Sequence, residues 1–242
     1  MSRAIDVRKL NITYKSVHGY SIKQIFSGNK ITRSKKVHAL KDVSFTVNEG
    51  EVVGIVGKNG SGKSTLLKAI GGIFSPDSGK VNTYGNTVAL LAIGAGFKTD
   101  LSGRENIMLN GLLLGFSQKE IMEKFQAIVD FSELGDFIEM PVSTYSSGMR
   151  SKLAFSIAVN LETQILLVDE ILSVGDAKFR AKSHRKMRSL ITDENRTVMI
   201  VSHSEGTLRT LCDRVLWLDQ GMVRMYDETN KVLDAYAEYM KE

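Results

Sequence analysis

An α/β fold built on a mostly parallel central sheet is the fold class that this sequence predicts. The runs Ile165–Val168 and Thr197–Val201 are short and apolar, which is typical of strands buried on both faces of a parallel sheet. Glu51–Val56 predicts a third buried strand. Segments with helical spacing lie between or after these runs, and strands that alternate with helices are typical of a parallel sheet.

The other elements are predicted from the same two periodicities, in chain order. Alternation of apolar and polar residues predicts strands at Ala4–Tyr14, Val43–Val47, Val215–Asp219 and Gly221–Tyr226, with the last two as a hairpin. Helical spacing predicts helices at Lys63–Ile70, Glu105–Leu114, Gln118–Phe131, Gly148–Leu161, Lys178–Leu190, Ser204–Cys212 and Thr229–Met240. The three helices between Glu105 and Leu161 would form one helical block.

We expect a single domain over residues 1–242, because a chain of this length has little room for a second one. Its core would comprise residues 1–92 and 162–242, mostly parallel sheet with an antiparallel part. A helical subdomain at residues 93–161 would be inserted between the two core segments.

Composition limits where the protein works. Cys212 is the single cysteine, which excludes an internal disulfide and a cysteine-based zinc site and fits a reducing cytoplasm. The first ten residues lack the apolar region of a signal peptide, and no run approaches the ~18 apolar residues of a membrane span. If the protein serves a membrane, we expect a partner to supply the spans.

The formal net charge of +5 is unevenly distributed, because nine Lys or Arg and no Asp or Glu lie between Val7 and Lys41. A nucleic-acid binder would be more uniformly basic, so we predict no nucleic-acid partner. Within this stretch, Lys15–Lys36 is interpreted as an insertion between two strands, with a short helix near Ser21–Phe26. It is either a solvated loop or a segment that faces anionic lipid headgroups or a lipid-linked cargo.

Residues Gly57–Thr65 read Gly-Lys-Asn-Gly-Ser-Gly-Lys-Ser-Thr and lie between a predicted strand and a predicted helix, the context of a phosphate-binding loop. The glycines let backbone N–H groups turn toward phosphates, and the helix N-terminus adds its positive end. Lys63 would reach the β- and γ-phosphates, Ser64 would ligate Mg²⁺ and Thr65 would bind the α-phosphate. The other expected binding residues of the loop are Gly57, Asn59, Gly60, Ser61 and Gly62.

Two carboxylates, Asp169 and Glu170, directly follow the predicted strand Ile165–Val168. The carboxyl ends of parallel strands meet at the edge of the sheet where ligands gather, so these groups should lie beside the phosphate-binding loop. Asp169 would hold Mg²⁺, and Glu170 would orient or deprotonate the attacking water.

Between these motifs, Tyr145–Arg150 reads Tyr-Ser-Ser-Gly-Met-Arg and opens a predicted helix, where hydroxyl and N–H groups can bind an anion. The order of the three motifs resembles the ATP-binding-cassette family of P-loop NTPases, whose signature runs Leu-Ser-Gly-Gly-Gln. Ser146 and Gly148 match that signature, whereas the residues around them, Ser147 included, depart from it. The resemblance covers nearly the whole chain.

The resemblance implies ATP and Mg²⁺ as ligands and a head-to-tail homodimer that sandwiches two ATP molecules. Ser146, Ser147 and Gly148 would each complete the partner's site. His203, which ends a predicted strand, resembles the switch histidine that contacts the γ-phosphate, and Ser173–Asp176 resembles the loop that communicates between protomers. Tyr14 resembles the aromatic residue that stacks on adenine, although a packing role for this side chain is the alternative.

One expected family residue is missing, because no Gln occurs near Ile93, where most transport members carry one. Instead Gly94–Phe97 and Leu101–Asn106 resemble exporters of cell-surface polysaccharide and teichoic acid. This resemblance implies an ATP-hydrolysing subunit, peripheral at the cytoplasmic face of the membrane, that powers polymer export through a separate multi-span permease. The alternatives are an importer or drug exporter of the same family, or a non-transport ATPase.

Overall fold

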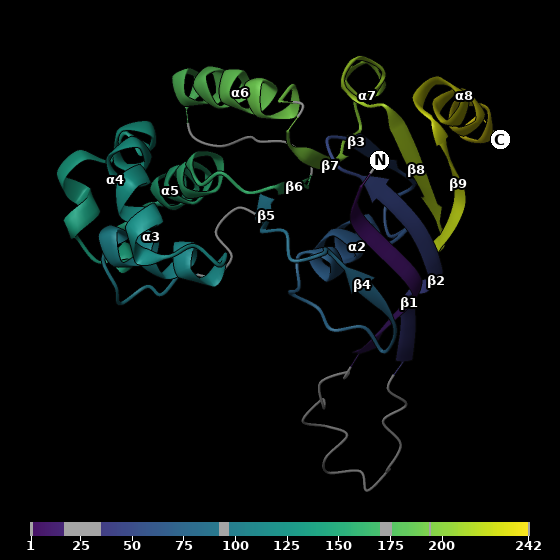
Figure 1. Cartoon of the computed structure of the whole chain (residues 1–242), viewed down its shortest axis with the longest axis horizontal. Coiled ribbons are helices and arrows are strands. Elements are labelled where there is room, and N and C mark those ends of the chain that lie inside the picture. Colours follow the sequence, from purple (N-terminus) through teal and green to yellow (C-terminus); the bar gives the residue numbers. More distant parts are fainter. Residues whose placement is uncertain (1, 17–34, 92–96, 170–175, 194, 242) are drawn as a thin grey trace, which may run out of the picture.

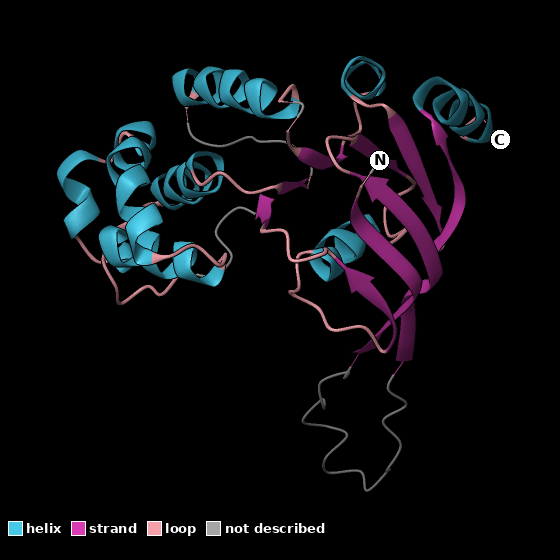
Figure 2. Ribbon diagram, viewed as in Figure 1, coloured by secondary structure: helices cyan, strands magenta, loops and turns pink. Residues whose placement is uncertain are grey.

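The computed structural model of the chain describes residues 2–16, 35–91, 97–169, 176–193 and 195–241. Within these residues, six strands form one sheet in the order β5-β6-β7-β3-β8-β9 (Figures 1 and 2). Their bounds are β3 Val52–Val56, β5 Val88–Leu91, β6 Ile165–Val168, β7 Thr197–Val201, β8 Arg214–Asp219 and β9 Met222–Glu228. Neighbouring strands pair parallel except β8 and β9, which pair antiparallel. The mostly parallel sheet is therefore confirmed.

The central strands are buried on both faces because each face is covered by a different layer. Along β3, Val53 and Ile55 belong to the core shared with the N-terminal strands and the first helix, whereas Val52 and Val56 pack into the core under the later helices. Successive side chains of a strand point to opposite faces, so both cores require apolar residues. This double burial explains the continuous apolar runs in the sequence.

Three further strands form the antiparallel sheet, in the order β2-β1-β4. Their bounds are β1 Arg3–Ser16, β2 Lys35–Asn48 and β4 Ser78–Asn82. The β1–β2 pairing continues to Lys15↔Lys36 and Ser16↔Lys35, so the predicted insertion Lys15–Lys36 is shorter than we expected: its ends belong to the strands. The predicted helix at Ser21–Phe26 lies outside the described residues.

The predicted helices are confirmed with small shifts at their ends. The observed bounds are α2 Lys63–Ile70, α3 Gly103–Leu113, α4 Gln118–Ser132, α5 Ser147–Asn160, α6 Ala177–Ile191, α7 Glu205–Leu211 and α8 Thr229–Tyr239. Ser102 caps α3 and Ser117 caps α4, each in a capping box with the Glu three residues later. Two short 3₁₀ helices, Gly135–Glu139 and Val142–Thr144, join α4 to α5.

Helices α3, α4 and α5 lie together on one side of the six-stranded sheet (Figure 1). They enclose a hydrophobic core of their own, in which Ile107, Ile121, Ile128 and Leu153 are fully buried. This separate core supports our proposal that residues 93–161 form a helical subdomain within one domain. None of the helices in the described part of the chain combines the length and hydrophobicity that crossing a membrane requires.

Candidate functional site

The motif Gly57–Thr65 comprises the phosphate-binding loop between β3 and α2 and the first residues of α2, as the sequence predicts. Gly57, Gly60 and Gly62 adopt φ angles of 151°, 80° and 107°, a region that favours glycine. A Cβ on Gly57 would lie 2.2 Å from the Leu218 carbonyl oxygen, and one on Gly62 would lie 2.6 Å from the Ala39 carbonyl oxygen. The backbone therefore depends on glycine at two positions for steric reasons as well as conformational ones.

Lys63 is 9% exposed and turns back across this loop. Its Nζ donates hydrogen bonds to the carbonyl oxygens of Gly57 (2.7 Å) and Lys58 (3.2 Å). The hydroxyl of Ser61 is buried and has no hydrogen-bond partner among the described residues. A buried unpaired hydroxyl costs free energy unless a ligand satisfies it, so a loop with this hydroxyl and an ammonium fits an anionic phosphate.

Tyr14, near the end of β1, lies beside the phosphate-binding loop. Its hydroxyl is 3.0 Å from the Thr65 hydroxyl, and its ring packs edge-on against Phe74 at a centroid distance of 5.8 Å. The ring is still 39% exposed, so a flat ligand can reach it. Both roles that the sequence left open are compatible with this position. The contact of Phe74 with Tyr14 was not predicted, because no local sequence pattern distinguishes Phe74.

The remaining catalytic candidates follow strands on the same side of the sheet. In the parallel register, Val168 of β6 pairs with Ile200 of β7, and Ile200 pairs with Gly54 of β3. Asp169 after β6 and His203 after β7 therefore emerge at the sheet edge where β3 enters the phosphate-binding loop. Asp169 is half-buried and His203 is exposed. Glu170 and Ser173–Gly175 lie outside the described residues.

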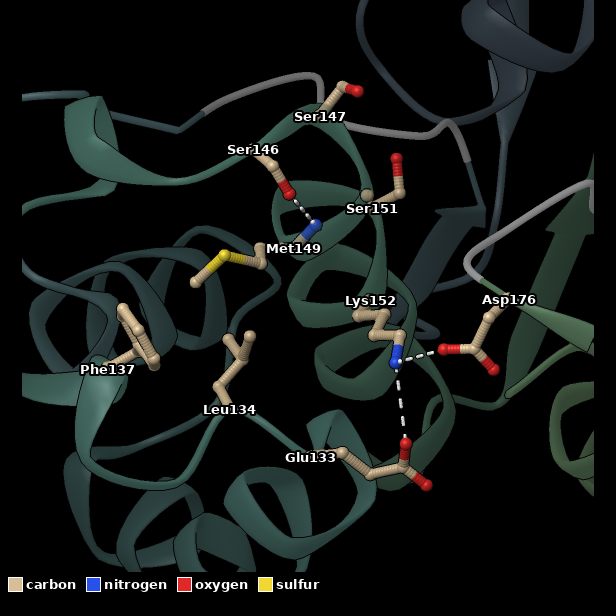
Figure 3. A pocket seen from close by; sticks show the side chains of 10 residues that line it. Glu133, Leu134, Phe137, Ser146, Ser147, Met149, Ser151, Lys152 and Asp176 are labelled. Carbon is tan, nitrogen blue, oxygen red and sulfur yellow. Dashed lines mark hydrogen bonds and ion pairs between the residues drawn. The ribbon is translucent and has the colours of Figure 1, made fainter. Parts of the chain in front are cut away.

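Ser146 caps α5, and its side-chain oxygen accepts a hydrogen bond from the Met149 amide at 3.2 Å (Figure 3). Ser146, Ser147 and Gly148 line a cavity of about 560 Å³, together with residues of the helical subdomain and Asp176. No residue of the phosphate-binding loop lines this cavity among those that the structure describes. The signature residues and the Gly57–Thr65 motif therefore lie on separate surfaces of the described chain.

An ion network that the sequence did not predict lies beside this cavity. The Nζ of Lys152, one helical turn after Gly148, is 3.0 Å from the Asp176 carboxylate and 3.4 Å from that of Glu133 (Figure 3). Glu133 is also 3.2 Å from the Nζ of Lys182 in α6. The network joins the helix that carries Ser146 and Gly148 to the helix that follows residues 170–175.

Asp176 and Lys152 both carry their charges at neutral pH. The Phe179 amide and the Lys152 ammonium lower the pKa of Asp176 to about 2. A carboxylate with a lowered pKa stabilises the fold fully above its ordinary value and loses that effect as pH falls through about 2. Burial disfavours the charged form of Lys152, but its carboxylate partners outweigh this and raise its pKa.

Residues 40–173, which are more than half of the chain, match the protein family described as ABC transporter. The chain belongs to the ABC transporter family. This confirms the family resemblance inferred from the three motifs.

Curated members of the family show close similarity. An O-antigen export system ATP-binding protein of Klebsiella pneumoniae is 40% identical over 87% of this chain and 85% of its own length. A protein of the same name from Myxococcus xanthus is 46% identical over 84% of this chain. A teichoic acids export ATP-binding protein of Lactococcus lactis is 44% identical over 88% of this chain. The chain spans 46% of the length of each of the last two relatives.

Solved structures confirm the fold of this ABC protein. A dimeric ATP-binding cassette in a post-hydrolysis state with ADP and phosphate superimposes with a TM-score of 0.69 at 22% identity, covering 93% of this chain and 98% of that one. The ATP-binding subunit of an ABC transporter gives a TM-score of 0.71 at 20% identity, covering 97% of this chain and 93% of that one. At these identities the likeness establishes the α/β ABC ATPase fold.

Proposed function

We propose that this ABC protein is the ATP-hydrolysing subunit of an exporter for a cell-surface polymer of the O-antigen or teichoic acid type. The phosphate-binding loop carries the enzymatic part of this proposal, because its buried Ser61 hydroxyl and the Lys63 ammonium suit a nucleotide phosphate. The named functions of the relatives support the polymer class. A separate multi-span permease would form the path across the membrane.

Each candidate residue has a role in this proposal. Backbone N–H groups of Gly57, Asn59, Gly60, Ser61 and Gly62, with the hydroxyl of Thr65, would bind the phosphates of ATP, and Tyr14 would stack on adenine. Lys63 would neutralise charge on the β- and γ-phosphates, and His203 would contact the γ-phosphate.

Ser64 and Asp169 supply the oxygen ligands that Mg²⁺ prefers, so they would hold this ion beside the phosphates. When bound, the ion would neutralise phosphate charge. Glu170 would take the proton of the attacking water as the bond to the leaving phosphate oxygen breaks.

The separation of the signature cavity from the Gly57–Thr65 motif supports a head-to-tail homodimer. The signature residues Ser146, Ser147 and Gly148 line their own cavity, so they would complete the site of a second copy rather than their own. ATP would then close the pair and hydrolysis would open it, which would drive the permease between its states.

We expect Glu170→Gln to bind ATP normally but to lower kcat by about a hundredfold, because an amide cannot act as a base. The variant should also accumulate an ATP-bound dimer. Steady-state phosphate release and size-exclusion chromatography with ATP would measure the two effects. Turnover close to wild type would remove Glu170 from this role.

The transport part of the proposal is tested by affinity purification from solubilised membranes. We expect the tagged protein to associate with the cytoplasmic face of the membrane. A multi-span permease should co-purify with it after solubilisation. A soluble partner in its place would favour a non-transport ATPase. A permease of an import system would contradict the proposed direction of transport.

The basic segment between β1 and β2 would contact the permease, anionic headgroups or lipid-linked cargo. Replacing residues 17–34 with a short Gly-Ser turn should leave ATPase activity intact, because Ser16 and Lys35 still pair, but should abolish polymer export. Reversing the charges of Lys23, Lys30 and Arg33 keeps the length of the segment and should cause part of the same loss of export. Cell-surface polymer would be quantified in cells. Normal export after the replacement would leave the segment as a solvated loop.

A further inference from the structure

The C-terminal helix contacts the phosphate-binding loop through one aromatic side chain. Tyr239, the last residue of α8, places its ring 4.4 Å from the Nζ of Lys58, measured to the ring centroid. Lys58 is the second residue of the loop, and its side chain is exposed. An ammonium over an aromatic face within about 6 Å makes a favourable cation–π contact.

The Tyr239 ring also contacts Arg224 and Trp217. The Arg224 guanidinium lies 4.3 Å from the centroid of Tyr239 and 4.7 Å from that of Trp217, whose ring is 5.1 Å from Tyr239. Arg224 is anchored by Asp219 at 3.2 Å. Trp217 is 4% exposed and pairs with Val56, the residue immediately before the loop. The support for Tyr239 therefore comes from β8 and β9, and β8 pairs directly with β3, the strand that leads into the loop.

Lys58 connects this support to the group that binds phosphate. Its carbonyl oxygen accepts hydrogen bonds from the Nζ of Lys63 at 3.2 Å and from the amide of Ser61 at 3.0 Å. The β8–β9 turn adds a second contact, because the Gly221 amide donates to the Ser61 carbonyl oxygen at 3.0 Å. Fixing the Lys58 side chain thus restrains a carbonyl that positions Lys63.

We propose that Tyr239 is a positioning residue for nucleotide binding, which holds the phosphate-binding loop in its binding conformation through Lys58. This inference rests on the proposed ATP binding. A loop that is already ordered costs less free energy to bind its ligand, so loss of the ring weakens binding without altering the chemical step. Through this contact, the position of α8 and the binding of ATP to the loop depend on each other.

The first test compares two leucine substitutions on the same helix. Tyr239→Leu should raise the Kd and KM for ATP about threefold at unchanged kcat, because a cation–π contact at an exposed site is worth about 0.5–1 kcal/mol. Tyr239→Phe keeps the ring and should restore wild-type values. Tyr236→Leu is the matched control, since Tyr236 also packs against Trp217, with a centroid distance of 5.3 Å, but makes no cation–π contact with Lys58 among the described residues.

The second test uses Trp217, the single tryptophan of the chain. Titration with ATP should change its fluorescence, because Tyr239 packs against it, and the change should be lost in Lys58→Met. The double variant Lys58→Met, Tyr239→Leu should have the same Kd for ATP as Lys58→Met alone. Melting temperatures of the leucine variants would separate weaker binding from unfolding.

The outcomes distinguish this inference from the proposed function. Failure of the wild-type protein to bind ATP would contradict the proposed function itself. Wild-type binding together with equal Kd values for Tyr239→Leu and Tyr236→Leu would overturn the role of Tyr239. An equal rise in Kd from Tyr239→Leu with and without Lys58→Met would show that the ring does not act through Lys58.

Discussion

Replacing Lys63 with methionine should lower kcat/KM for ATP by about a thousandfold, since a preorganised charge in a shielded site contributes that much. The side chain already lies in the loop, where it donates to the carbonyl oxygens of Gly57 and Lys58. Methionine fills a similar volume without a charge, so the phosphates lose their direct cation. Nucleotide titration and phosphate release would measure binding and hydrolysis separately.

Lys68→Met is the matched control for this experiment. Lys68 lies in the last turn of the same helix, α2, and its Nζ is 5.6 Å from the ring centroid of Phe74 rather than in the loop. The control should keep near wild-type activity. Equal losses in the two variants would indicate that the effect comes from the helix rather than from the phosphate-binding lysine.

Gly148→Asp should lower the rate of hydrolysis by as large a factor as Lys63→Met. The isolated chain should nevertheless fold and bind ATP. A Cβ at Gly148 would meet only the Ser146 side-chain oxygen, at 3.8 Å, among the described atoms within 4 Å. The substitution is therefore sterically tolerated within one chain. A carboxylate on this surface would instead repel the phosphates of ATP bound to the partner. ATP binding by the variant, its melting temperature and its turnover would be measured together.

Mixing this variant with Lys63→Met tests the shared site directly. Half of the random dimers would pair the two variants, and each such dimer would hold one site with an intact lysine and an intact signature. Activity should therefore return to about a quarter of the wild-type level. Gly148→Ala, which adds no charge, serves as the control for size. Full activity of Gly148→Asp alone would contradict the shared geometry.

Much of the fold was predictable because its signals are local. The central strands β3, β6 and β7 are buried on both faces, so their apolar runs identify them. Strands β4 and β5 were missed. Ser78–Asn82 is mostly exposed and carries no alternation, whereas Val88–Leu91 merges with the apolar run that follows it. Their pairing with β1 and β6 determines both strands, and that information is not local.

The candidate site divides in the same way. The phosphate-binding loop was predictable because its glycines, lysine and hydroxyls are consecutive and serve one turn of backbone. The Lys152–Asp176 pair and the Tyr239–Lys58 contact were not, because their partners meet only after the chain has folded. Neither Lys152 nor Tyr239 belongs to a motif. Only the tertiary structure identifies them.

The pairing of Ser16 with Lys35 has a consequence for how this family member can change its sequence. Because the two strand ends pair, the segment that connects them closes a loop, which carries an entropic cost. That cost grows by only about 0.6 kcal/mol for each doubling of length. Reducing the length of the 17–34 stretch to a quarter would therefore change the loop-closure contribution to the free energy of unfolding by only about 1 kcal/mol. In evolutionary terms, loop-closure entropy therefore sets little limit on the length of a segment inserted between Ser16 and Lys35.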